Sequence, residues 1–271
     1  MSKRELKSEQ GALPGLLAPD EPAPVEIVNP EGKAPILLVC DHASRFVPRA
    51  LGGNLGLDEA DLSRHIAYDI GIAEVSRALA RRLDAPLVLS TFSRLVIDPN
   101  RTLGLPSSIP PESDGVAIPL NQDLGEAERE ARAATFFRPY HATVARMIEA
   151  KIAGGQEPSF VSLHSFTPMI AGRQRPWQVG ILWNEAPRIA VPLMEAVRAR
   201  GLTVGDNDPY TGRDHHGYKV HSHAEPRGLV HALIELRQDL IDTPAGVAEM
   251  TDCVEGALGE AFAAAGVAAA A

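Results

Sequence analysis

Short apolar runs alternate with longer amphipathic stretches along most of this 271-residue chain. A continuous apolar run bounded by turn residues is typical of a strand covered on both faces, whereas an apolar face repeating every three or four residues indicates a helix. The predicted strands are residues 35–40, 85–91, 159–164, 177–183, 202–204 and 229–236. The predicted helices are residues 58–65, 72–83, 125–153, 187–201 and a last helix that begins near residue 244.

Strands that alternate with helices, without an internal repeat, predict an α/β fold: a three-layer sandwich in which one mostly parallel sheet lies between helices. Pro139 should kink or split the helix at 125–153. Residues 1–30 are rich in Pro, Glu and Ala, and we expect them to form a mobile N-terminal arm. The rest of the chain, residues 31–271, is predicted to be a single domain.

Two long polar segments, residues 102–121 and 206–227, interrupt this pattern. Loops of this length in a compact domain are often lids or binding loops. The second segment is rich in histidine, with His215, His216, His221 and His223. Two alternatives remain open for it: it forms a wall of the functional site, or it is a solvated surface.

Composition limits the class of protein. Apolar residues make up 45% of the chain and charged residues 23%, which is ordinary for a globular protein. A formal net charge of −9 argues against general affinity for nucleic acid. No run approaches the roughly 18 apolar residues that a membrane span needs, and the start of the chain shows no signal peptide. With only two cysteines a disulfide framework is excluded, and we expect a cytoplasmic protein.

Several predicted strands end in chemically useful side chains. In a sheet covered by helices, the carboxyl ends of parallel strands form the crevice where ligands bind. His42 and His164 could supply two of the three protein ligands of a catalytic zinc. Glu235 could take a proton from water and return it to a leaving nitrogen. Asn100 and Arg101 suit a substrate carboxylate.

Each of these residues also has a purely structural interpretation. His164 could be a hydrogen-bonded core histidine, and Asp69 could cap the helix that follows it. Residues 98–100 could form a plain turn. Glu235 and Arg237 lie two apart on one strand face and could belong to a structural ion pair.

Four separated segments, in the expected order along the chain, resemble the N-formylglutamate amidohydrolase family, over about residues 35 to 265. They are Asp41-His42-Ala43-Ser44, residues 65–71 (His-Ile-Ala-Tyr-Asp-Ile-Gly), residues 93–101 (Ser-Arg-Leu-Val-Ile-Asp-Pro-Asn-Arg) and residues 234–240 (Ile-Glu-Leu-Arg-Gln-Asp-Leu). A more distant resemblance is to the zinc carboxypeptidases and aspartoacylase. It implies a phosphorylase/hydrolase-like fold of the zinc exopeptidase type, with a mixed, mostly parallel sheet between helices. It also implies that His164 binds zinc, that Asn100 and Arg101 bind the substrate carboxylate, and that Glu235 is the base.

The chain departs from the carboxypeptidase pattern at one metal ligand. Carboxypeptidases supply their first two ligands as His-x-x-Glu, whereas here Arg45 stands three residues after His42. An arginine cannot bind zinc. Asp69 is therefore our candidate for the third ligand, with His65 and Asp41 as further options.

The resemblance implies an enzyme that hydrolyses the amide of N-formyl-L-glutamate, or of a similar small N-acyl amino acid, to the free amino acid and formate. Zinc or another divalent metal would bind His42, His164 and Asp69, and Glu235 would be the base. Arg94 would stabilise the oxyanion. The expected substrate-binding residues are Asn100, Arg101, Ser44, Arg173 and Arg213, the last two for a second carboxylate. The alternatives are a carboxypeptidase-like or other deacylase with a different substrate, and a non-catalytic relative that binds an acidic metabolite. The oligomeric state stays open.

Overall fold

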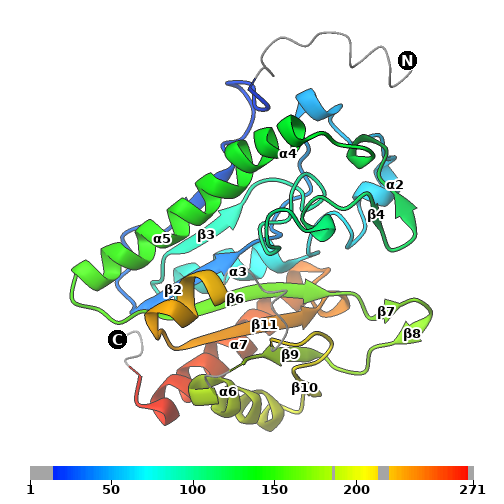
Figure 1. Ribbon diagram of the computed structural model, residues 1–271. Coiled ribbons are helices and arrows are strands. Elements are labelled where there is room, and N and C mark those ends of the chain that lie inside the picture. Colours follow the sequence, from blue (N-terminus) through cyan, green and yellow to red (C-terminus); the bar gives the residue numbers. More distant parts are fainter. Residues whose placement is uncertain (1–14, 185–186, 213–219, 268–271) are drawn as a thin grey trace.

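The computed structural model describes residues 15–184, 187–212 and 220–267 (Figure 1). Its centre is a seven-stranded sheet with the order β1-β3-β2-β6-β11-β9-β10. The strands are β1 (Val25–Val28), β2 (Ile36–Cys40), β3 (Leu87–Ser90), β6 (Ser159–Phe166), β9 (Val179–Leu182), β10 (Val204–Asp206) and β11 (His231–Arg237). Neighbouring strands are parallel except at β1–β3 and β9–β11, so the predicted mixed, mostly parallel sheet is confirmed.

The boundary of the expected N-terminal arm is corrected by the sheet. Val25–Val28 lie within the predicted arm of residues 1–30, but they form β1, which pairs antiparallel with β3. The pairing fixes this segment through backbone hydrogen bonds and makes it an edge strand of the sheet. The short, half-buried Val-Glu-Ile-Val sequence did not predict this strand. Residues 1–14 lie outside the described part of the chain.

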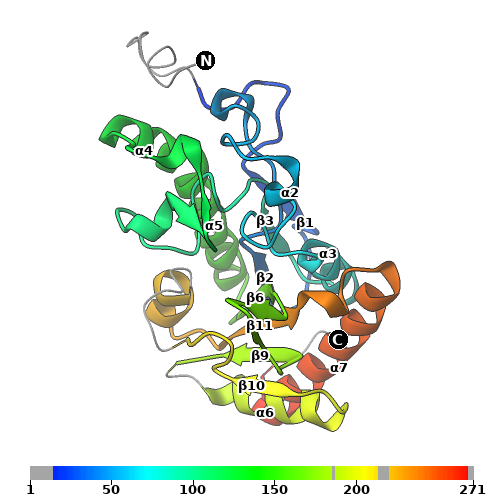
Figure 2. The ribbon, with the colours of Figure 1, turned by 90° about the vertical axis from the view of Figure 1, so that its right-hand side faces the viewer.

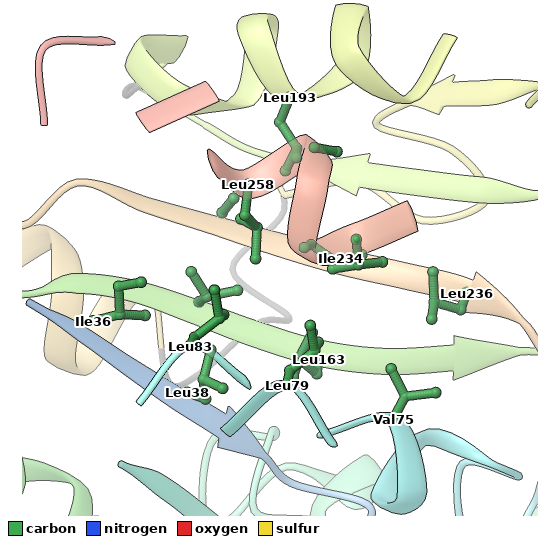
Figure 3. Close-up of a cluster of buried hydrophobic side chains, with 14 of the residues drawn as sticks. Ile36, Leu38, Val75, Leu79, Leu83, Leu163, Leu193, Ile234, Leu236 and Leu258 are labelled. Carbon is green, nitrogen blue, oxygen red and sulfur yellow. The ribbon is translucent and has the colours of Figure 1, made fainter. Parts of the chain in front are cut away.

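Helices cover both faces of the sheet, as Figures 1 and 2 show. On one face, α3 (Ile72–Arg82), α6 (Pro187–Ala199) and α7 (Pro244–Ala265) pack on alternate strand residues, and on the other face lies α5 (Arg138–Ala153). Figure 3 shows part of the first layer, where Leu38, Leu163 and Ile234 from three strands meet Leu79 and Leu258 from two helices. Side chains of each strand point alternately to the two faces of the sheet, and each helix packs its apolar stripe on one face. This packing produces the three layers that the sequence predicted.

The remaining elements are short. They are α2 (Glu59–Leu62), α4 (Glu126–Arg132), the π-helices Ala133–Phe137 and Val220–Ala224, the hairpins β4–β5 (Glu112–Ser113, Val116–Ala117) and β7–β8 (Met169–Ile170, Arg173–Gln174), and the 3-10 turns Arg49–Leu51, Pro106–Ser108, Pro119–Asn121, Glu225–Arg227 and Gln238–Leu240. The π-helix at 133–137 splits the predicted helix of residues 125–153 just before Pro139, which lies in the first turn of α5 where a missing N–H is tolerated.

The two faces of the sheet differ in how they are covered. Helix α5 packs mainly on β1, β2 and β3, and it also meets Phe160 near the start of β6. Beyond it, Ser162 and His164 of β6 and His231 and Glu235 of β11 lie on the same face, and the segment 220–227 crosses this region (Figures 1 and 2). This half-covered region, toward the carboxyl ends of β2 and β6, is where the candidate site lies.

Candidate active site

Three predicted metal ligands come together at the ends of β2 and β6. His42 follows β2, His164 lies in β6, and Asp69 precedes α3. Their potential ligand atoms all lie within 4.8 Å of one another, and all three residues are buried. Asp69 Oδ2 is 2.8 Å from His164 Nδ1 and 3.4 Å from His42 Nδ1.

The other nitrogen of each imidazole faces a second carboxylate. His42 Nε2 is 2.8 Å from Asp98 Oδ1, and His164 Nε2 is 3.5 Å from Asp41 Oδ2. The Tyr140 hydroxyl donates to Asp41 Oδ1 over 2.5 Å. Carboxylates in this position fix the orientation and tautomer of metal-binding histidines, so that Nδ1 of both rings is presented to a ligand on the Asp69 side.

The structural alternative for Asp69, a helix cap, is wrong. The residue preceding α3 is Gly71, which has a left-handed backbone with φ of 77° and makes no side-chain cap. A Cβ at that position would come within 2.2 Å of the Ile241 carbonyl oxygen, which requires a glycine. The Asp69 carboxylate turns inward instead, where it also accepts a hydrogen bond from the Ser165 backbone N–H.

Electrostatics keep this carboxylate ionised. Burial alone would raise the pKa of Asp69, but the neighbouring His42 and His164 outweigh it and lower the pKa below its ordinary value. The pKa of Asp98 is likewise well below its usual range, because His42 and Arg94 outweigh the effect of burial.

Arg94 joins the two carboxylates. Its guanidinium donates to Asp98 Oδ2 over 2.9 Å and to Asp69 Oδ1 over 3.4 Å. Burial would lower the pKa of Arg94, but the two aspartates raise it further above the ordinary value. Arg94 is therefore a fixed cation beside the cluster.

The donor set fits a divalent cation. Three buried carboxylates, those of Asp41, Asp69 and Asp98, surround two imidazoles, and the guanidinium of Arg94 pairs with two of the three. Buried negative charge is costly unless it is compensated, and a divalent cation would compensate it. Zinc accepts this combination of nitrogen and carboxylate ligands.

Glu235 lies directly beside His164, opposite it in the parallel register of β11 and β6. It is buried, with 6% of its surface exposed. Arg237, two residues on, donates to Asp239 over 2.7 Å, so the structural ion pair that the sequence allowed for this strand forms at Arg237. On the other side Glu235 faces Gly180 of β9, which has no side chain to compete for the space.

A cavity of about 440 Å³ connects these groups. Seven of the ten predicted site residues line it: His42, Asp69, Arg94, Asn100, Arg101, His164 and Glu235. The Asn100 backbone N–H donates to Asp98 Oδ1 over 2.8 Å, which places the Asn100–Arg101 pair next to the metal cluster.

The other three predictions fare differently. Ser44 is half-buried outside the lining of the cavity, and its hydroxyl accepts a hydrogen bond from the Phe46 backbone N–H over 3.1 Å, which uses it in a local turn. Arg173 is exposed in the β7–β8 hairpin and also does not line the cavity. Arg213 lies outside the described residues, as do His215 and His216. His65 lies near Asp114, at 3.7 Å, rather than in the metal cluster.

Sequence reasoning missed several residues of the site. Asp98 was considered only as part of a possible turn, although it lies between Arg94 and Arg101 in a segment that follows a strand. Tyr210 lines the cavity, and its hydroxyl accepts a hydrogen bond from Arg175 over 3.1 Å. Burial and the nearby Glu235 raise the pKa of Tyr210.

Part of the histidine-rich segment enters the site. His221 lines the cavity and lies 2.5 Å from Glu225. His223 is buried, and its Nε2 is 2.9 Å from Nδ1 of His141 on α5. His141 Nε2 donates to the Pro99 carbonyl over 2.9 Å. The segment is therefore tied through α5 to the residues next to Asn100.

The fold and the site define an α/β protein with a buried His–Asp–His cluster that opens on a cavity. The family model of the N-formylglutamate amidohydrolases matches residues 34–242. The chain belongs to this family and is a hydrolase that acts on amide bonds.

Solved structures support the fold. A gene product of Agrobacterium tumefaciens is 38% identical, with a TM-score of 0.89 over 92% of this chain and 98% of that one. N-formylglutamate amidohydrolase from Ralstonia eutropha is 20% identical, with a TM-score of 0.59 over 89% of this chain and 98% of that one, and this likeness shows a shared fold. Comparison with curated proteins gave no match. None of the described helices is long and apolar enough to cross a membrane.

Proposed function

We propose that this protein is a metal-dependent amidohydrolase that cleaves N-formyl-L-glutamate, or a similar N-acyl amino acid, to the free amino acid and formate or another short acid. One observation carries the proposal: the His42–Asp69–His164 cluster opens on the same cavity as Glu235. A cluster of buried ligands beside a buried carboxylate suits hydrolysis better than simple binding. A protein that merely binds an acidic metabolite gains nothing from a second buried negative charge.

His42, His164 and Asp69 would hold the metal, with zinc as the first candidate. When bound there, a divalent cation supplies a Lewis acid for the amide carbonyl. Asp98 and Asp41 would keep the two imidazoles oriented, and Arg94 would hold the charge of Asp69 and Asp98 in place.

Glu235 would move the proton. It takes a proton from water as the oxygen attacks the amide carbon, and it returns the proton to the nitrogen as the C–N bond breaks. Arg94 lines the cavity and keeps N–H groups beyond those used by the two aspartates, because a guanidinium has five. It can donate to the oxyanion, a role that in other enzymes is worth about 3 kcal/mol per donor.

Asn100 and Arg101 would bind the α-carboxylate of the substrate. Both line the cavity, and the backbone of Asn100 is fixed by Asp98 next to the cluster. Among the described residues that line the cavity, the arginines are Arg94 and Arg101. With Arg173 away from the cavity, a second carboxylate such as that of glutamate would depend on Arg101 or on Arg213.

Formate release from N-formyl-L-glutamate tests the proposal. The purified protein is stripped with a chelator, assayed, reloaded with zinc and assayed again, and its metal content is measured at each stage. We expect release that depends on the metal. No release with metal bound would point to another acyl group or amino acid, and no release with no bound metal would favour a non-catalytic binding protein.

A further inference from the structure

The cavity extends well beyond the metal cluster, along one face of β11. Glu235, Leu233 and His231 alternate onto the same face of this strand, and all three line the cavity. Glu235 lies four residues after His231 in the strand, and four steps of about 3.3 Å each span about 13 Å. The cavity thus continues from the proposed base to the beginning of the strand.

Part of the wall of this extension is apolar. Leu182 of β9 lies directly opposite Leu233 in the antiparallel register, and both side chains are buried. Val220, from the segment that crosses this face of the sheet, also lines the cavity. His231 closes the end, held by the bond between its Nδ1 and the Leu229 carbonyl at 2.9 Å. We call Leu182, Val220, His231 and Leu233 the acyl recess.

The order of the strands indicates how a bound substrate would be oriented across the sheet. The Asn100–Arg101 pair follows β3 in the chain, whereas the acyl recess lies on β11 and β9. His42 and His164, at the ends of β2 and β6, lie between them in the sheet. A substrate with its carboxylate on Asn100 and Arg101, and its amide at the cluster, therefore directs its acyl group toward the recess.

We propose that the recess binds the linear aliphatic acyl chain of an N-acyl amino acid, so that the preferred substrates carry acyl groups longer than formyl. This inference rests on the proposed function and names its substrate class. A cavity of about 440 Å³ is within the range that encloses ligands much larger than N-formylglutamate. Hydrolysis adds water across the C–N bond: the acyl carbon leaves as a carboxylic acid, and the nitrogen leaves as the free amine.

The inference is tested with a series of N-acyl-L-glutamates whose acyl groups are formyl, acetyl, butyryl, hexanoyl and octanoyl. The zinc-loaded protein is used and released glutamate is measured, so that one readout serves every substrate. We expect kcat/KM to rise about fourfold per added methylene, the ratio that burial of one methylene gives, until the chain reaches His231. Leu233→Phe should reduce kcat/KM for the hexanoyl substrate at least tenfold more than for the acetyl substrate, since the ring fills the recess.

Leu105→Phe is the matched control, because Leu105 is 44% exposed and does not line the cavity. It should leave the whole series unchanged. Highest kcat/KM for the formyl substrate, with a fall at each added carbon, would overturn the inference and leave the proposed function standing. An equal loss on all substrates in Leu233→Phe would also overturn it. Release from none of the series by the metal-loaded protein would overturn both.

Discussion

Glu235 and His164 occupy opposite positions on neighbouring parallel strands, with Ile234 opposite Leu163 one step earlier and Leu236 opposite Ser165 one step later. The register of two buried strands, rather than a loop, thus sets the spacing between the proposed base and a proposed metal ligand. Register is strongly specified where both faces of a sheet are buried, because a slip by one residue would turn every side chain to the opposite face. The apolar neighbours Ile234 and Leu163 pack in the core and hold the pair in place.

Replacement of Glu235 by Gln should remove the proton transfer and keep the shape of the side chain. We expect kcat to fall by about 10²- to 10⁴-fold, the usual contribution of a general acid–base group, with little change in substrate affinity. Steady-state kinetics on the best substrate and calorimetric binding of the product amino acid measure the two effects. Asp239→Asn is the control, since Asp239 pairs with Arg237 and does not line the cavity. Full activity in Glu235→Gln would remove Glu235 from the role of base.

The strands that carry the site were predictable because their apolar runs are continuous and their ends are polar. His42, His164 and Glu235 followed from that pattern alone. Strand β1 was not predictable, because four half-buried residues at an edge carry too little hydrophobic signal. The alternation of side chains along each strand shows on which face of the sheet a residue lies. Which half of that face is left uncovered depends on where helix α5 packs.

The partners of the site residues were harder to predict than the residues themselves. Tyr140 and Asp41 are 99 positions apart in the chain, and only the packing of α5 on the sheet brings them together. Arg173 was chosen for its charge, and charge alone does not say whether a side chain points into a cavity or into solvent. Asp69 came from a resemblance, and its inward orientation depends on Gly71, which makes a side-chain cap unnecessary.

Asp98 should tune metal affinity without binding the metal. In Asp98→Asn, the carboxylate that faces His42 Nε2 loses its charge, and we expect metal affinity to fall by about 10- to 100-fold. Competition with a chromophoric chelator measures the dissociation constant. Asp114→Asn serves as the control, because that carboxylate pairs with Arg64, at 2.7 Å, outside the metal cluster. Equal affinities in the wild type and Asp98→Asn would show that this carboxylate does not support the site.

Metal should also stabilise the fold, since the carboxylates of Asp41, Asp69 and Asp98 are buried close together and a divalent cation would offset their negative charge. An ion that binds the native state at about 1,000 times its dissociation constant adds about 4 kcal/mol to the free energy of unfolding. We expect the thermal midpoint of chelator-treated protein to rise on addition of zinc. In Asp69→Asn this rise should shrink, because an amide is a weaker ligand than a carboxylate. Identical midpoints with and without zinc in the wild type would contradict a metal site at this cluster.

Tyr140 should make stability depend on pH in the alkaline range. Burial, together with the charge of Asp41, raises the pKa of its hydroxyl well above the ordinary value near 10. The unfolded chain therefore loses this proton at a lower pH than the native protein does. The stabilisation is fully present below pH 10 and is lost as the pH rises above it, at up to about 1.4 kcal/mol per pH unit.

Urea unfolding of the wild type and Tyr140→Phe at a series of pH values from 8 to 11 measures this effect. Tyr140→Phe should be less stable at pH 8, by about 1 to 3 kcal/mol, because Asp41 loses a buried hydrogen-bond donor. Its stability should then fall less steeply than that of the wild type above pH 10, because the phenylalanine has no proton to lose. Lysine and the other tyrosines titrate in both proteins, so the difference between the two slopes isolates Tyr140. If the stabilities of the two proteins fell in parallel above pH 10, the Tyr140 hydroxyl would ionise as readily in the native protein as in the unfolded chain. That result would contradict the raised pKa of Tyr140.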